Sequence, residues 1–107
     1  MTRASPSRSP ALAVTDDDVR AVEAILRRFP ELAHLRVRRR AAVVTIESGV
    51  NDRPIAHARI RRQAAKIWQL EMANHMGRWQ PTPFCGSRDE LVEVLIGNFG
   101  WTLAERV

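Results

Sequence analysis

Arginine is the residue type most able to do chemistry in this chain of 107 residues, because it is concentrated in one segment. Between residues 34 and 66, nine Lys and Arg residues stand against two acidic residues, Glu47 and Asp52, so this segment has a net charge of +7. The flanking segments, residues 1–33 and 67–107, carry net charges of 0 and −2. Guanidinium groups bind phosphates and carboxylates through charge-assisted hydrogen bonds. A regional basic field of this kind favours anionic partners.

The other polar residues lack the spacing that metal binding requires. No two of His34, His57, His75 and Cys85 lie three to five residues apart, as the paired ligands of most zinc sites do. A distant set of His57, His75 and Cys85 is the remaining alternative. We therefore predict no metal and no cofactor.

Catalytic groups are equally hard to assemble from the sequence. Cys85, the single cysteine, comes two residues before a predicted helix start, where the helix dipole would favour a thiolate, but no sequence feature ties a histidine to it. The acidic residues near 16–18 and 89–93 fall in predicted first helical turns, where capping accounts for them. Glycine-rich phosphate loops are absent. We predict no catalytic residue, which leaves the arginines as the candidate site.

The elements that would position these arginines begin with a helix. Thr15 is a predicted N-cap, and Asp16–Asp18 follow it in the first turn, where they complement the helix dipole. Apolar residues then recur at helical spacing: Val19, Val22, Ile25, Leu26 and Phe29. Pro30 ends the pattern, so we predict a helix over 16–29.

The basic segment itself has the alternation of strands. A two-residue turn at Arg40–Ala41 would pair Val37 with Val44 and Leu35 with Ile46 on one face. It would also pair Arg38 with Val43 and Arg36 with Thr45 on the other face. One continuous strand over 35–47 is the alternative.

A second predicted hairpin joins residues 54–62 to residues 66–73. In it, Ala56, Ala58 and Ile60 face Trp68, Leu70 and Met72, while the opposite face carries His57, Arg59 and Arg61 beside Gln69 and Glu71. His57 then lies opposite Glu71, where a surface hydrogen bond is its expected role. Residues 77–80 form a short final strand, and residues 81–84 an extended connector.

A C-terminal helix completes the predicted fold. Ser87 and Glu90 form a capping box, and the helix it opens buries Leu91, Val94, Leu95 and Phe99. Trp101 and Leu103 are expected to pack back on the body. The fold class is therefore α+β, with a four- to five-stranded antiparallel β-meander and an N-terminal and a C-terminal helix packed on one face. Residues 1–13 are a predicted disordered tail, and residues 14–107 a single domain.

A resemblance rests on four segments in fixed order, HARIRR, WQLEM, GRWQPTPF and FGWTL. With them, residues 34–104 resemble a small single-domain bacterial protein family to which no activity is assigned. The resemblance implies a bacterial single-domain protein and transfers no catalytic residue. Trp68 and Trp79 are expected in the core.

The prediction for function is a non-enzymatic binding module whose arginine-rich sheet face docks on nucleic acid or on an acidic protein. Seven residues form the predicted site: Arg36, Arg38, Arg39, Arg40, Arg59, Arg61 and Arg62. The predicted face lacks the aromatic residues on which single-strand binders stack bases, so a solvated charged face or a docking surface for an acidic protein explains the pattern equally well. A ribonuclease toxin of the RelE-like kind is the alternative function, and a homodimer through sheet edges is an open possibility. The N-terminus has no apolar signal region and no segment reaches the length of a membrane helix, which predicts a cytoplasmic protein without membrane contact.

Overall fold

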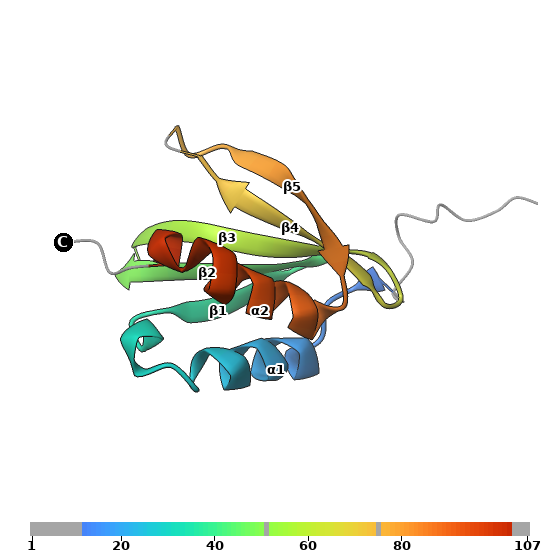
Figure 1. The fold of residues 1–107 in the computed structure, drawn as a ribbon, viewed down its shortest axis with the longest axis horizontal. Helices are drawn as coiled ribbons and strands as arrows, with labels where there is room; N and C mark the ends of the chain where they lie inside the picture. The colour runs from blue at the N-terminus through green and yellow to red at the C-terminus, as the bar shows by residue number, and fades with distance from the viewer. Residues whose placement is uncertain (1–11, 51, 75, 104–107) are drawn as a thin grey trace, which may run out of the picture.

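Five antiparallel strands follow one another along the chain and pair in the same order, β1-β2-β3-β4-β5 (Figure 1). The computed structural model describes residues 12–50, 52–74 and 76–103. Its strands are β1 (Arg36–Arg40), β2 (Val43–Val50), β3 (Arg53–Ala64), β4 (Ile67–Ala73) and β5 (Trp79–Gly86). Its helices are α1 (Asp16–Leu26), α2 (Arg88–Phe99) and two short 3-10 helices, η3 (Pro30–Leu32) and η4 (Gly100–Leu103). The predicted α+β meander is confirmed. Residues 1–11 of the predicted tail lie outside the described residues.

A single hydrophobic core joins the sheet to both helices. From the sheet it includes Val44, Ile46, Ala58, Ile60 and Leu70, all without exposed surface. Buried side chains of α1 and α2 complete it, among them Val22, Leu26, Leu91 and Leu95. In Figure 1, α2 crosses the sheet and α1 lies along β1. Burying each of these Val, Leu and Ile side chains contributes about 1.5–3 kcal/mol. The core therefore stabilises the sheet whose opposite face displays the arginines.

The β1–β2 hairpin turns one residue later than predicted. Ala41 and Ala42 form the turn, and Val37 pairs with Ile46 and Arg38 with Thr45. Moving a turn by one residue shifts the pairing by two, which leaves each side chain on its predicted face. The turn is fixed by long-range contacts: the amide of Val14 donates to the Ala41 carbonyl at 2.9 Å, and the amide of Arg62 to that of Ala42 at 2.8 Å. No local pattern could have shown these.

Strand β5 is longer than the predicted four residues and includes the segment 81–84, which was expected to be a connector. Pro81 and Pro83 have no amide hydrogen to give to a ladder. Side chains bridge the gap instead, because the Gln69 amide donates to the Thr82 carbonyl and the Thr82 hydroxyl to the Leu70 carbonyl, both at 2.9 Å. The β3–β4 register is also shifted by two residues from the predicted one, because Ile60 lies opposite Leu70 and Arg62 lies opposite Trp68.

Helix α1 ends at Leu26, earlier than the predicted 29, because proline restricts the residue before it as well as its own position. Phe29, which precedes Pro30, has an extended backbone (φ −121°, ψ 104°), and Pro30 opens η3. At the other end of the chain the expectation for Leu103 is confirmed, since it is fully buried. The expectation for Trp101 is wrong: its side chain is 78% exposed.

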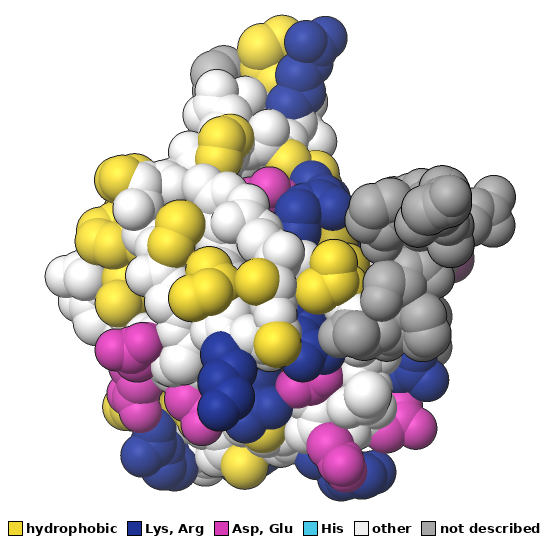
Figure 2. Space-filling model, turned by 90° about the vertical axis from the view of Figure 1, so that its right-hand side faces the viewer, with side chains coloured by type: hydrophobic (Ala, Val, Ile, Leu, Met, Phe, Trp, Pro, Cys, Tyr) yellow, Lys and Arg dark blue, Asp and Glu magenta, His cyan; other side chains and the backbone are white. Residues whose placement is uncertain are grey.

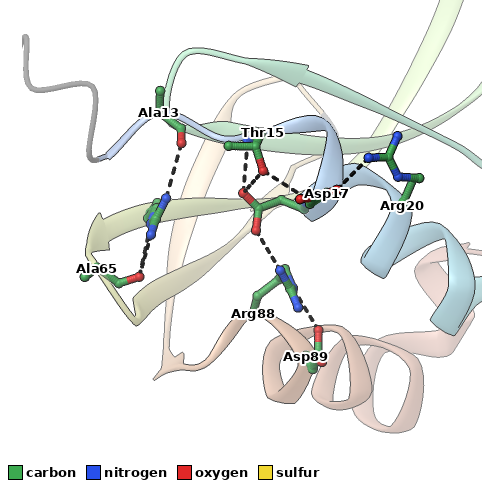
Figure 3. Close-up of polar contacts among 9 residues, drawn as sticks. Ala13, Thr15, Asp17, Arg20, Ala65, Arg88 and Asp89 are labelled. Carbon is green, nitrogen blue, oxygen red and sulfur yellow. Dashed lines mark hydrogen bonds and ion pairs between the residues drawn. The ribbon is translucent and has the colours of Figure 1, made fainter.

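The first turns of the two helices are tied together by an ion pair (Figure 3). The Thr15 and Ser87 capping boxes are both present. The carboxylate of Asp18 accepts from the Thr15 amide at 2.9 Å and from Arg88 Nη1, in the first turn of α2, at 2.7 Å. Burial raises the pKa of Asp18, but the hydrogen bonds from Thr15 and Arg88 outweigh it and hold the pKa below its ordinary value of 3.8.

We expect Asp18→Asn to lower the free energy of unfolding by about 1–2 kcal/mol at neutral pH, because one cap and one partly buried ion pair are weakened. A carboxyl whose pKa is depressed in the folded state stabilises the protein above pH 4 and loses this effect as the pH falls through the folded pKa. The difference in the free energy of unfolding between the wild type and Asp18→Asn should therefore shrink below pH 4. Urea denaturation at pH 7 and pH 3 measures it. Asp17→Asn, an exposed change in the same turn, is the control, and an equal loss in that variant would contradict the role of Asp18.

Candidate functional site

Five of the seven predicted site residues share the sheet face opposite the core. Arg36, Arg38 and Arg40 reach it from β1, and Arg59 and Arg61 from β3. The register places Arg38, Thr45 and Arg59 in one row across three strands, and Arg40, Val43 and Arg61 in the next. We call Arg36, Arg38, Arg40, Arg59 and Arg61 the arginine face.

A buried carboxylate, Glu47, holds the β1 side of this face. Its Oε2 accepts from Arg36 Nε at 3.2 Å, and its Oε1 accepts from Arg38 Nε and Nη2 at 3.1 and 3.0 Å. Glu47 is only 5% exposed, so both ion pairs are largely shielded from solvent on the acidic side. Arg36 also donates to the carbonyl groups of Gly49 and Ser48 in β2. One carboxylate thus fixes two neighbouring guanidinium groups.

Glu71 does the same for the β3 side. It is 9% exposed and accepts from Nε of Arg59 through Oε1, and from Nε of Arg61 through Oε2 at 3.4 Å. The Arg59 guanidinium lies over the ring of Trp79, 4.4 Å from its centroid. Such a cation–π contact contributes about 0.5–2 kcal/mol and keeps the guanidinium plane fixed.

These bonds leave donors available. Within the described residues, Arg59 and Arg61 bond through Nε alone, so their terminal amines are not committed to a protein acceptor. Five arginines and two glutamates give the face a net charge of +3, against +5 for the whole chain. The geometry is therefore that of preorganised donors for an anion rather than of fully neutralised ion pairs.

The other two predicted site residues, Arg39 and Arg62, are not brought together with these five. Arg39 points to the opposite side of β1 and pairs with Asp16 of α1 at 2.7 Å. Arg62 donates to the carbonyls of Ala65 and Ala13 and lies over Trp68, 5.7 Å from the ring centroid. Arg40 is exposed at the end of β1, and its side chain has no hydrogen bond or ion pair within the described ranges. Arg40 thus lies at the edge of the arginine face, while Arg39 and Arg62 serve the packing of the N-terminal region.

A second basic cluster lies at the helix starts and does not form a comparable face. A pocket of about 270 Å³ there is lined by Arg62, Lys66 and Arg88, but also by Asp18 and Asp89. Figure 2, which views the molecule from this end, shows Lys and Arg side chains lying next to Asp and Glu side chains. Arg88 is bonded to both acids, at 2.7 and 2.8 Å. The cluster is an ion-pair network that joins the helices.

Two predictions about this face are wrong. His57 does not lie on it opposite Glu71: it is 1% exposed and bonds Ser48 and the Thr102 carbonyl on the core side. Trp79 does not lie in the core, and the face does contain an aromatic side chain. A β-bulge in the β2–β3 pair breaks the alternation at His57. Trp79 pairs with Ala73, two residues from Glu71 in β4, and this pairing places it on the arginine face.

Neither a metal cluster nor a membrane-spanning helix is found in the described part of the chain. No three His, Cys, Asp or Glu residues there could hold a metal ion. Cys85 is exposed near the end of β5, and His75, part of the distant metal-ligand alternative, lies outside the described residues. No described helix is both long and apolar enough to cross a membrane. Comparison with protein families, curated proteins and solved structures finds no match to this chain.

Proposed function

We propose that the protein binds nucleic acid through the arginine face, as a binding module without catalysis. The observation that carries the proposal is the pair of buried glutamates, Glu47 and Glu71, each holding two arginines on one sheet face. Ordering long side chains is costly in entropy, so guanidinium groups that are fixed before binding lose less when they meet phosphates. We place this activity in the cytoplasm, as the sequence predicts.

The side chains that surround the arginines favour nucleic acid over an acidic protein as the partner. The core of a protein–protein interface is typically apolar and poor in charge, whereas this face offers few exposed apolar side chains besides Val43 and Trp79. Phosphate backbones are read by arginines and polar side chains without an apolar centre. Trp79, half-buried under Arg59, adds the kind of ring and guanidinium surface on which an unpaired base can stack.

The test is a charge reversal with a matched control. Arg38→Glu with Arg61→Glu should weaken the binding of a labelled single-stranded RNA at least about tenfold at physiological salt, and reduce the slope of log K against log salt by about 1.4. Arg20→Glu with Arg27→Glu changes the net charge equally, but on α1. Fluorescence anisotropy measures both variants against the wild type, on RNA and on DNA.

Two results would overturn the proposal. The first is an equal loss of binding in the α1 control, which would show that net charge alone matters. The second is a wild-type protein that binds neither RNA nor DNA at low salt. Capture of an acidic protein through Arg38 and Arg61 under those conditions would point to the other predicted partner.

No observation favours the ribonuclease alternative. A general base must come within hydrogen-bond distance of the substrate hydroxyl. His57 is buried on the core side, and both of its ring nitrogens are already bonded. Among the described residues, no histidine lies on the arginine face to act as this base.

A further inference from the structure

An apolar groove lies at the end of the molecule away from the helix starts. It has a volume of about 830 Å³ and runs between the β3 and β4 strands and the end of α2. Apolar residues dominate its lining, including Ile55, Met72, Phe99 and Trp101. In Figure 1 the β4–β5 hairpin and the C-terminal end of α2 diverge on this side of the molecule.

The groove is built for an uncharged occupant. Among the described residues that line it there is no Asp, Glu, Lys or Arg, although 27% of the chain is charged. Its polar members are bonded within the protein: His57 bonds Ser48 and the Thr102 carbonyl, and the Thr102 hydroxyl donates to the Phe99 carbonyl, each at 2.7 Å. The third, Asn74, accepts through Oδ1 from the amides of Met76 and Arg78. An apolar group can therefore enter without leaving a buried polar atom without a partner.

The surface around the groove also exposes an apolar side chain of the kind that the groove can accept. Trp101 lines the groove, yet its side chain is 78% exposed. The other large hydrophobic side chains that the described residues expose are Ile67 and Met76, and neither lines the groove. Tryptophan buries more apolar surface than any other side chain and is enriched in the centres of interfaces.

We propose that two copies of this chain pair about a two-fold axis, with Trp101 of each copy seated in the groove of the other. A two-fold interface uses one patch twice, so the patch must carry both the inserted group and its receptor. This patch carries both, and the described residues of its groove lack the charges that an acidic or basic partner would require. The residues of the arginine face do not line the groove, so the proposal stands apart from nucleic-acid binding.

Sedimentation measurements test the pairing directly. At protein concentrations of about 10–100 µM the wild type should contain a dimer, and Trp101→Ala should raise the dimer Kd about thirtyfold or more, as the loss of an interface hot spot does. Ile67→Ala removes an exposed apolar side chain elsewhere and should change the Kd less than about threefold. A wild type that stays monomeric throughout this range overturns the proposal.

A mixing experiment separates reciprocal insertion from general stickiness. Ile55→Arg puts a charge into the groove but keeps Trp101, whereas Trp101→Ala keeps an open groove. Each variant alone should be monomeric, and their mixture should form a heterodimer with one intact contact. Absence of that heterodimer would refute the exchange, as would a Trp101→Ala dimer of wild-type strength. Ala73→Arg, also in the groove lining, replaces Ile55→Arg if that variant does not fold.

Discussion

Replacing His57 with alanine is expected to lower the free energy of unfolding by about 3 kcal/mol, although no catalytic role is assigned to this residue. The carbonyl of Thr102 can only accept a hydrogen bond, so Nδ1 of His57 donates to it, and in the neutral ring Nε2 accepts from the Ser48 hydroxyl. Both distances are 2.7 Å. The ring thus connects β2, β3 and η4 at a point with almost no solvent access.

The stability lost in His57→Ala comes from a cavity and from lost hydrogen bonds, and a second variant separates these two parts. His57→Ala leaves a cavity and also leaves the Ser48 hydroxyl and the Thr102 carbonyl without their partner. Ser48→Ala removes only one hydrogen bond and should cost about 1 kcal/mol. Urea denaturation followed by circular dichroism compares the two. A His57→Ala cost no greater than that of Ser48→Ala would show that the ring does not hold η4 to the sheet.

His57 reaches this position because of a β-bulge. Ile46 pairs with Ala58 and Glu47 with Ala56, which leaves His57 without an opposite residue in β2. A bulge re-aims a side chain by breaking the alternation of the strand. Period-two counting placed His57 beside Arg59 and Arg61, and nothing in the local sequence marks the bulge. The surface hydrogen bond to Glu71 that this counting predicted is therefore replaced by buried bonds to Ser48 and Thr102.

Alternation and capping were the parts of the fold that the sequence could predict. Burial of one sheet face requires apolar residues at every second position, so Val44, Ile46, Ile60 and Leu70 were placed on the correct face despite register errors of two residues. The Thr15 and Ser87 caps were predicted because capping boxes are local, with both partners within three residues.

The composition of the arginine face could be predicted only in part. The alternation located Arg36, Arg38, Arg59 and Arg61, but not the burial of Glu47 or the position of Trp79. Arg39 was predicted as part of the site because it sits in a basic run, whereas its partner, Asp16, lies 23 residues away in α1. A count of charges does not reveal which of them are paired in the fold. The side of the strand separates them, because Arg39 bonds Asp16 through Nε alone, as Arg59 and Arg61 bond Glu71, but lies on the opposite side of β1.

The largest backbone effect is expected for Gly49→Ala, which should lower the free energy of unfolding by about 3 kcal/mol. Gly49 has φ +85°, a conformation that costs a residue with a side chain about 1 kcal/mol or more. A Cβ atom at this position would also lie 2.6 Å from the carbonyl oxygen of Arg53, a backbone atom that cannot rotate away. Relieving such an overlap moves the strand and typically costs a further 1–3 kcal/mol or so.

Gly77→Ala isolates the first of these two costs. Gly77 has nearly the same backbone angle, φ +77°, but a Cβ atom there would meet no described atom within 4 Å. Its expected cost is therefore only about 1 kcal/mol. Because the Gly49 carbonyl also accepts a hydrogen bond from Arg36, Gly49→Ala should disturb the arginine face and weaken RNA binding, whereas Gly77→Ala should leave binding unchanged. Denaturation and anisotropy on both variants measure this, and equal stability losses would show that the β2–β3 turn yields to a methyl group.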